Sequence, residues 1–284
     1  INSPYEPPEQ PLLTIRSLQA SDVERAVGAI CDQLGLSSLP RESFDGVILD
    51  LFGTLVELPP PEARRALLDG LELSPDSELG RMVAAGAVLA PLMAALGVAY
   101  EHGRRLLQTR RFPSIAAAAH ALGAAAGGAT AAALVSRYER HLAPWYAAYQ
   151  LAPGAAALLD ALVAAGVPIA ILSNADSFSA GVVSALGLDR YAKAVLLSCD
   201  LGLEKPAAGA FQRAFDALGV DASGAIVIGD GWRSDVEGAV RAGAGAVWIN
   251  RDGAPSPARL PLPLRRRIIE VPGLATCSRL FADV

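Results

Sequence analysis

The chain has 284 residues, with 24 basic and 29 acidic side chains and a formal net charge of −5. This mildly acidic balance argues against broad nucleic-acid binding, which requires a basic face. Three cysteines (Cys31, Cys199 and Cys277) without a C-x-x-C pair exclude a disulfide framework and a Cys-rich zinc site, and they fit a cytoplasmic protein. Among the basic residues only Lys193 and Lys205 are lysines and the rest are arginines, so a specific role is worth seeking for each lysine.

Residues 1–43 are predicted to be an N-terminal extension. Its first ten residues are polar and rich in Pro, unlike a signal peptide. A short helix is expected to begin at Ser21, which has the capping-box spacing to Glu24. The apolar side of that helix would pack on the main body or on a second subunit, so we expect a monomer or a homodimer.

Five short apolar runs, each bounded by turn residues, predict strands, and helix-length segments separate the later ones. The runs lack strict alternation, as is typical of strands covered on both faces. Alternating strands and helices predict an α/β fold with a doubly wound parallel sheet, in which ligands bind beyond the carboxyl ends of the strands. The predicted strands are 46–49, 167–172, 194–197, 225–228 and 246–249, and the predicted helices are 177–186, 207–218 and 234–242.

The interval between the first two strands is too long for one crossover. Residues 59–149 are rich in Ala, Leu and Arg and have helical spacing, which predicts an inserted helical domain over the ligand-binding edge. The core domain would comprise residues 44–58 and 150–284. The uncharged stretch 82–100 reaches the length of a membrane span, but Ala and Gly dominate it and Pro91 interrupts it. We therefore predict two buried helices there and no membrane association.

The first strand ends in an acidic residue. Asp50 follows the apolar run directly and would lie at the rim of the sheet, where it is partly desolvated. Gly53 allows a sharp turn below it, and Thr54 can orient or hydrogen-bond the carboxylate. Alone, such an acid would be read as a turn cap. The Pro-rich tail near the other end of the chain is predicted to wrap over the surface.

Polar residues also follow the later strands. Ser173 and Asn174 offer a hydroxyl and backbone N–H groups at a helix start, which is a natural cradle for an anion. Lys205 lies in the loop after the third strand, and Asp230 and Asp235 flank a Gly-containing loop after the fourth. Carboxylates, a cation and an anion cradle at one edge predict a site for Mg²⁺ and phosphate, since Mg²⁺ prefers hard oxygen ligands.

Together, in this order, the four strand ends resemble the motifs of the haloacid dehalogenase-like (HAD) superfamily of hydrolases. The matching segments are Asp50 to Leu55, Ser173-Asn174, Lys205-Pro206, and Gly229-Asp230 through Asp235. The resemblance covers residues 44–284. It implies a Rossmann-like core with a helical cap inserted after the first strand.

The resemblance also implies a metal-dependent mechanism. Asp50 would be the nucleophile and form an aspartyl-phosphate. Asp50, the backbone carbonyl of Phe52 and Asp230 would hold Mg²⁺, and Asp235 would support the metal directly or through water. For the transferring group, the resemblance implies that Ser173 and the Asn174 amide bind it and that Lys205 neutralises the gathered charge.

One position departs from the phosphatases of this superfamily. They carry a second Asp, the general acid/base, two residues after the nucleophile, where this chain has Phe52, which can donate no proton. General acid/base help is worth roughly 10²–10⁴-fold in rate. Haloacid dehalogenases proper also have an aromatic residue there and need no metal. Their last motif generally lacks the first acid of the pair, however, whereas this chain keeps both Asp230 and Asp235.

Three functions remain open at this point. The first is an Mg²⁺-dependent phosphatase acting on a small phosphorylated metabolite. Either the metabolite has a good leaving group, or a nearby residue (a borrowed acid) replaces the missing general acid. The second is a dehalogenase-type hydrolase that attacks carbon, and the third is a protein that binds a phosphorylated ligand with little turnover. Candidates for a borrowed acid are Glu57 and the cap residues Glu101, His102, Glu139 and His141.

Overall fold

The computed structural model describes residues 44–123, 128–255, 260–265 and 267–277, and every structural statement below concerns this part of the chain. The N-terminal extension and the helix predicted in it lie outside the described residues. Cys199 and Cys277 are buried free thiols.

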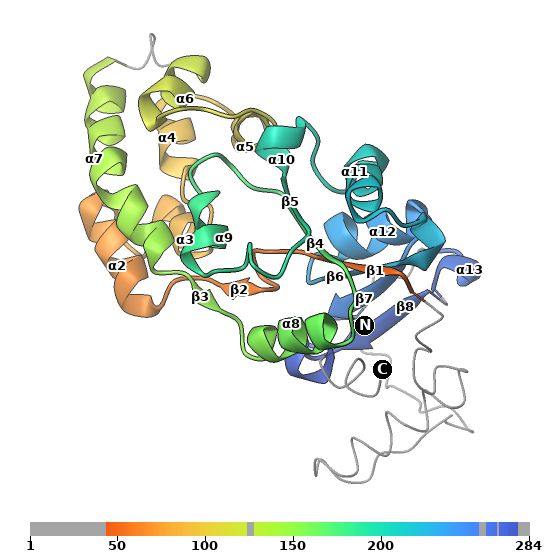
Figure 1. Ribbon diagram of the computed structural model, residues 1–284. Coiled ribbons are helices and arrows are strands. Elements are labelled where there is room, and N and C mark those ends of the chain that lie inside the picture. Colours follow the sequence, from red (N-terminus) through yellow and green to blue (C-terminus); the bar gives the residue numbers. More distant parts are fainter. Residues whose placement is uncertain (1–43, 124–127, 256–259, 266, 278–284) are drawn as a thin grey trace, which may run out of the picture.

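Six parallel strands form the central sheet (Figure 1). The order β5-β4-β1-β6-β7-β8 runs outward from β1 in both directions, so β1 lies at the point where the winding reverses. This confirms the doubly wound fold, and in such sheets ligands bind where the winding reverses. The strands are β1 (Gly46–Leu49), β4 (Ile169–Ser173), β5 (Ala194–Leu197), β6 (Ala225–Gly229), β7 (Gly245–Ile249) and β8 (Ile268–Val271).

Helices cover both faces of this sheet because its side chains alternate between two hydrophobic clusters. Val47 and Leu49 of β1 pack in one cluster with α8 (Ala155–Ala164) and α9 (Gly181–Ala185). Ile48 packs in the other with α11 (Ala208–Leu218) and α12 (Gly238–Arg241). All three side chains are fully buried, as expected for a strand covered on both faces.

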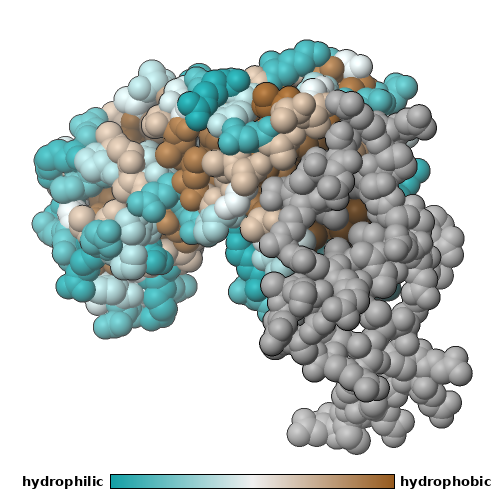
Figure 2. Space-filling view, turned by 60° about the horizontal axis from the view of Figure 1, so that its bottom comes forward, coloured by the Kyte–Doolittle hydropathy of each residue, from teal (hydrophilic) through white to brown (hydrophobic). Residues whose placement is uncertain are grey.

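A helical unit interrupts the chain between the first strand and the rest of the sheet. It stands on a small antiparallel ribbon, in which β2 (Val56–Glu57) pairs with β3 (Gln150–Leu151). Figure 2 shows it as a separate lobe, with hydrophobic residues gathered where the two lobes join. Its helices are α2 (Pro61–Gly70), α3 (Glu78–Ala84), α4 (Ala90–Ala95), α5 (Tyr100–Gln108), α6 (Ile115–Ala121) and α7 (Gly128–Ala147).

The uncharged stretch 82–100 contains the end of α3 and the whole of α4, and the break between these two short helices lies at 85–89, just before Pro91. Pro91 lies in the first turn of α4, where its missing N–H removes no helical hydrogen bond. Val83 and Leu92 are fully buried, which accounts for the absence of charge. No helix in the described ranges is both long and apolar enough to cross a bilayer.

Three predicted segments differ from the structure. The helix expected over 177–186 is only the short α9, and that over 234–242 starts as a π-helix (Trp232–Glu237) before α12. The π-helix arises because the Gly231 carbonyl accepts hydrogen bonds from Asp235 N at 2.8 Å and from Val236 N at 3.3 Å. The prediction that the tail merely wraps the surface was wrong, since it forms α13 (Leu262–Arg265) and then β8, which pairs with β7.

Candidate active site

Asp50 lies immediately beyond β1, at the carboxyl edge of the sheet. Its backbone N–H donates to the Ile228 carbonyl of β6 at 2.9 Å, which fixes the residue at this edge. The side chain is 6% exposed and accepts a hydrogen bond from Lys205 Nζ at 2.7 Å. Burial raises the pKa of the Asp50 carboxyl to about 7, although the Lys205 ammonium works in the opposite direction.

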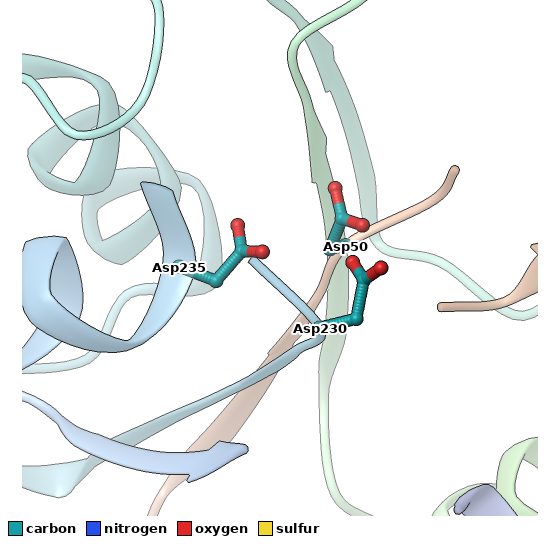
Figure 3. A group of neighbouring side chains, drawn as sticks. All are labelled: Asp50, Asp230 and Asp235. Atoms are coloured by element: carbon teal, nitrogen blue, oxygen red, sulfur yellow. The ribbon is translucent and has the colours of Figure 1, made fainter. Parts of the chain in front are cut away.

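Asp230 and Asp235 follow the carboxyl end of β6, and their side chains lie close to that of Asp50. Asp230 directly follows that strand and Asp235 lies in the π-helix, and the three carboxylates lie close together (Figure 3). One oxygen of each lies within 4.8 Å of the others. Lys205 Nζ lies 2.6 Å from Asp235 Oδ1, so its ammonium bridges Asp235 and Asp50. The structure therefore brings together four of the residues that the sequence singled out.

Charge in this cluster does not balance. Three carboxylates face a single buried ammonium, and the exposed Arg251 acts on Asp230 through its charge, so the carboxylates outnumber the cations that act on them. Burial opposes the charge on Lys205, but Asp235 and Asp50 outweigh it and raise the pKa of that ammonium. Burial, followed by the charge of Asp235, raises the pKa of Asp230. An all-oxygen donor set with this charge deficit fits a divalent cation such as Mg²⁺.

Thr54 and Gly53, which follow Asp50 closely in sequence, determine how Asp230 is placed. Thr54 is fully buried, and its Oγ1 accepts from the Asp230 N–H at 3.1 Å and donates to Asp230 Oδ1 at 3.4 Å. Thr54 therefore orients Asp230, whereas the sequence suggested that it would contact Asp50. Gly53 has φ +86°, and a Cβ there would lie 2.4 Å from Asp230 Oδ2. Glycine at this position thus leaves room for the carboxylate.

Trp248 is a supporting residue that the sequence did not indicate. Its Nε1 donates to the Asp230 carbonyl at 3.0 Å, and its ring meets that of Trp232 edge to face at 4.8 Å. Trp232, which lies between Asp230 and Asp235 in sequence, therefore packs against β7. Trp248 lies within the buried strand β7, where an aromatic residue is expected for packing alone, so the sequence carried no functional signal for it.

The second strand end supplies one engaged and one unpartnered polar side chain. Asn174 Nδ2 donates to the Lys205 carbonyl at 2.9 Å, and its Oδ1 accepts from the Lys205 N–H at 2.7 Å. The side-chain amide thus positions Lys205. Ser173 is 1% exposed, and its Oγ has no hydrogen-bond partner in the described part of the chain. A buried hydroxyl without a partner is costly unless a ligand satisfies it.

A cleft of about 480 Å³ opens between these strand ends and the helical unit. The Phe52 ring meets the ring of Tyr149 edge to face at 5.2 Å, and Tyr146 stacks on Tyr149 at 6.0 Å. The aromatic residues at the base of α7 therefore both line the cleft and pack against the segment that follows β1. The cleft is lined by Phe52, Gly53, Leu58, Ala85, Gly86, Ala87, Tyr100, Gln108, Tyr146, Tyr149, Asn174, Ala175, Asp176, Ser179 and Asp230.

The candidates for a borrowed acid lie elsewhere. Glu57, Glu101, His102 and Glu139 are exposed. His141 packs against Gly70 of α2, where an added Cβ would lie 2.6 Å from the imidazole. Within the described ranges, no member of this set lines the cleft. The acid that does line it, besides Asp230, is Asp176, which the sequence analysis overlooked although it lies three residues after Ser173.

Contacts between α5 and the core hold the helical unit over this cleft. Arg104 Nη1 lies 3.1 Å from Glu204 Oε2, next to Lys205. Gln108 Nε2 donates to the Asn174 carbonyl at 3.4 Å, and Arg111 pairs with Asp200 of α10 (Ser198–Leu201). The two lobes therefore meet at the same strand ends that carry the carboxylate cluster.

Comparison with known proteins identifies the class. The sequence model of the haloacid dehalogenase-like hydrolases matches residues 44–243, and the chain belongs to this family. It is 34% identical over 209 residues to a phosphoglycolate phosphatase of Rhodospirillum rubrum, a match that covers 71% of this chain and 77% of the relative.

Shorter matches name both phosphatases and dehalogenases. Over 105 residues the chain is 37% identical to a phosphoserine phosphatase of Thermus thermophilus, covering 36% of this chain and 42% of the relative. It is 38% identical over 105 residues to (S)-2-haloacid dehalogenase 4A of Burkholderia cepacia, covering 36% and 45%. The chain thus matches less than half the length of these two curated relatives.

Solved structures show the same architecture. A 2-haloacid dehalogenase of Pseudomonas syringae superposes with a TM-score of 0.53 at 25% identity, covering 84% of this chain and 99% of that one. A HAD hydrolase of Bacillus subtilis bound to magnesium superposes with a TM-score of 0.56 at 22% identity, covering 85% and 99%. The second likeness concerns the fold alone.

Proposed function

We propose that this hydrolase is an Mg²⁺-dependent phosphatase that acts on a small phosphorylated molecule through an aspartyl-phosphate at Asp50. The observation that carries the proposal is the cluster of Asp50, Asp230 and Asp235, whose carboxylates outnumber the cations that act on them and offer oxygen ligands to a divalent cation. Asp50, the Phe52 carbonyl and Asp230 would hold Mg²⁺, with Asp235 as a direct or water-mediated support. The bound ion would lower the repulsion between the Asp50 carboxylate and an anionic phosphoryl group.

The protein's own residues then position the transfer. The unpartnered Ser173 Oγ and the backbone N–H of Asn174 would donate to phosphoryl oxygens, and Lys205 would neutralise charge beside Asp50. An Asp50 oxygen attacks phosphorus, the bond to the leaving oxygen breaks, and that oxygen takes its proton from solvent. Water then attacks phosphorus, which releases inorganic phosphate and restores the carboxylate.

The absence of a proton donor at position 52 sets the expected substrate. None of the five candidate proton donors lines the cleft, and Asp176, which does, is not part of the carboxylate cluster, so we expect departure of the leaving group to depend on its own stability as an anion. We therefore propose a phosphomonoester with a good leaving group. Residues 59–149 would act as the cap that closes over it, since α5 already contacts the strand ends.

The dehalogenase alternative is less well supported. A 2-haloacid carries a carboxylate that the site has to bind. Within the described residues, the lining of the cleft contains no Lys, Arg or His. Two acids after β6 would be superfluous for a metal-free attack on carbon.

The proposal is tested by assaying phosphate release from p-nitrophenyl phosphate and halide release from 2-chloropropionate, each with Mg²⁺ and with EDTA. We expect Mg²⁺-dependent phosphate release, a loss of at least ~10³-fold in Asp50→Asn, and no halide. Metal-independent halide release would establish the dehalogenase instead. If neither product forms while calorimetry detects bound inorganic phosphate, the protein is a phospho-ligand binder.

A further inference from the structure

Asp176 brings a second carboxylate into the cleft, outside the metal cluster. It follows β4 and is half-buried. Its Oδ1 accepts from the Phe178 and Ser179 N–H groups, both at 2.9 Å. Its Oδ2 accepts from the Tyr146 hydroxyl at 3.3 Å. Since a carboxylate oxygen can accept two hydrogen bonds, Oδ2 keeps capacity for a ligand.

No cation of the described chain balances this carboxylate. No Lys, Arg or His side chain of the described ranges lies within 4.0 Å of it, and the described lining of the cleft holds none. Arg104 lines a small adjoining cavity that Asp176 also lines, but Glu101 and Glu204 lie 3.0 and 3.1 Å from its guanidinium and neutralise it. Burial raises the pKa of Asp176, and the hydrogen bonds from Ser179, Phe178 and Tyr146 work in the opposite direction.

Aromatic side chains make up much of the same wall. Phe52, Tyr100, Tyr146 and Tyr149 all line the cleft. Burial raises the pKa of Tyr149 to about 12 and that of Tyr146 well above its usual value, so both phenols stay neutral. Aromatic faces attract cations electrostatically, most strongly where water is excluded.

We infer that the cleft selects a leaving group with a positively charged nitrogen, held by Asp176 and the aromatic wall. The inference rests on the proposed phosphatase function and specifies its substrate class: phosphomonoesters whose leaving group carries an ammonium group. A leaving group with a carboxylate would meet an uncompensated negative charge and is selected against. The aromatic wall also provides an apolar surface for an aryl leaving group, which needs no protonation to depart.

Asp176 also has a local structural role, and the test has to separate the two. Its Oδ1 caps the two N–H groups ahead of α9. Asn caps as well as Asp does, so Asp176→Asn keeps the cap and removes only the charge. Asp160 offers a matched control, because it too accepts a tyrosine hydroxyl, from Tyr191 at 3.0 Å, but it is exposed and does not line the cleft.

Three aryl phosphates serve as probes, since they share one skeleton and differ in charge: phenyl phosphate with a para aminomethyl, hydroxymethyl or carboxymethyl group. For the unmodified protein with Mg²⁺ we expect kcat/KM to rank ammonium over hydroxyl by about tenfold, and hydroxyl over carboxylate. Asp176→Asn should bring the ammonium-to-hydroxyl ratio below about threefold. Asp160→Asn should leave the ratio as it was.

A ratio near one in the unmodified protein, or a ratio that survives Asp176→Asn, overturns the inference while p-nitrophenyl phosphate hydrolysis still supports the phosphatase. If no probe is hydrolysed, the proposed function fails. The same ranking is then measured as affinity by calorimetry on Asp50→Asn, which binds without turnover. Equal affinities for the three probes there would also overturn the inference.

Discussion

Replacing Lys205 with Met should be the most damaging single change in this protein. Lys205 is 4% exposed and its ammonium bridges Asp50 at 2.7 Å and Asp235 at 2.6 Å, so its removal leaves two buried carboxylates to repel each other. Breaking a buried pair in this way costs about 3–5 kcal/mol of stability. Phosphate release should fall by at least ~10²-fold, because charge beside the phosphoryl group is no longer neutralised. Urea unfolding and a phosphate assay measure the two effects.

The other lysine of the chain provides the matched control. Lys193 is exposed, and its Nζ donates to the Leu218 carbonyl at the end of α11 at 2.8 Å. Lys193→Met should cost only about 1 kcal/mol and leave turnover unchanged. Lys205→Arg is a second variant that separates misfolding from a loss of activity. It keeps the positive charge between the buried carboxylates but not the compact shape of an ammonium. If Lys205→Met retains turnover within threefold of the unmodified protein, the ammonium has no role in phosphoryl transfer.

Introducing an acid at position 52 should raise turnover. Phe52 is two residues after Asp50 and lines the cleft, so a carboxyl group there could protonate the leaving group and activate water. Such help is worth roughly 10²–10⁴-fold, and we expect Phe52→Asp to recover at least about tenfold in kcat for an alkyl phosphate. The variant should also lose about 0.5–1.5 kcal/mol of stability with the edge-to-face contact to Tyr149.

Phe52→Asn distinguishes the effect of a proton donor at position 52 from the effect of removing the bulky ring. It is as small as the Asp variant but has no ionisable group, so it should gain no turnover. Equal gains in both variants would mean that the phenyl ring merely obstructs the cleft. No gain in Phe52→Asp would mean that another group already supplies the proton or that Asp50 does not attack phosphorus.

Sequence alone predicts five of the six strands of the central sheet because each is a short apolar run bounded by turn residues. It did not predict β2 and β3, since two residues are too few to show a periodicity. The edge strand β8 was missed for another reason. Its Ile268-Ile269 pair follows Pro and Arg residues that suggest a surface loop, and it becomes a strand by pairing with β7.

For the site, the sequence predicted which residues come together but not which hydrogen bonds they form. Parallel strands end at one edge of the sheet, which explains why the side chains after them meet: Asp50, Lys205, Asp230 and Asp235. That Thr54 binds Asp230, and that Asn174 holds the Lys205 backbone, depends on contacts across 176 and 31 residues of sequence. Such pairings are decided by packing, so a motif can indicate that a polar residue belongs to the site without assigning its partner.

A rapid-quench search for a phosphoenzyme tests the central claim most directly. With phenylalanine at position 52 no side chain there activates the water that cleaves the aspartyl-phosphate, so the second half-reaction should be the slow one. With Mg²⁺ and p-nitrophenyl phosphate we predict a burst of p-nitrophenol close to one per enzyme molecule, and peptide mass spectrometry after acid quenching should place the phosphoryl group on Asp50. Steady phosphate release with no burst and no label on Asp50 would contradict phosphoryl transfer through this residue.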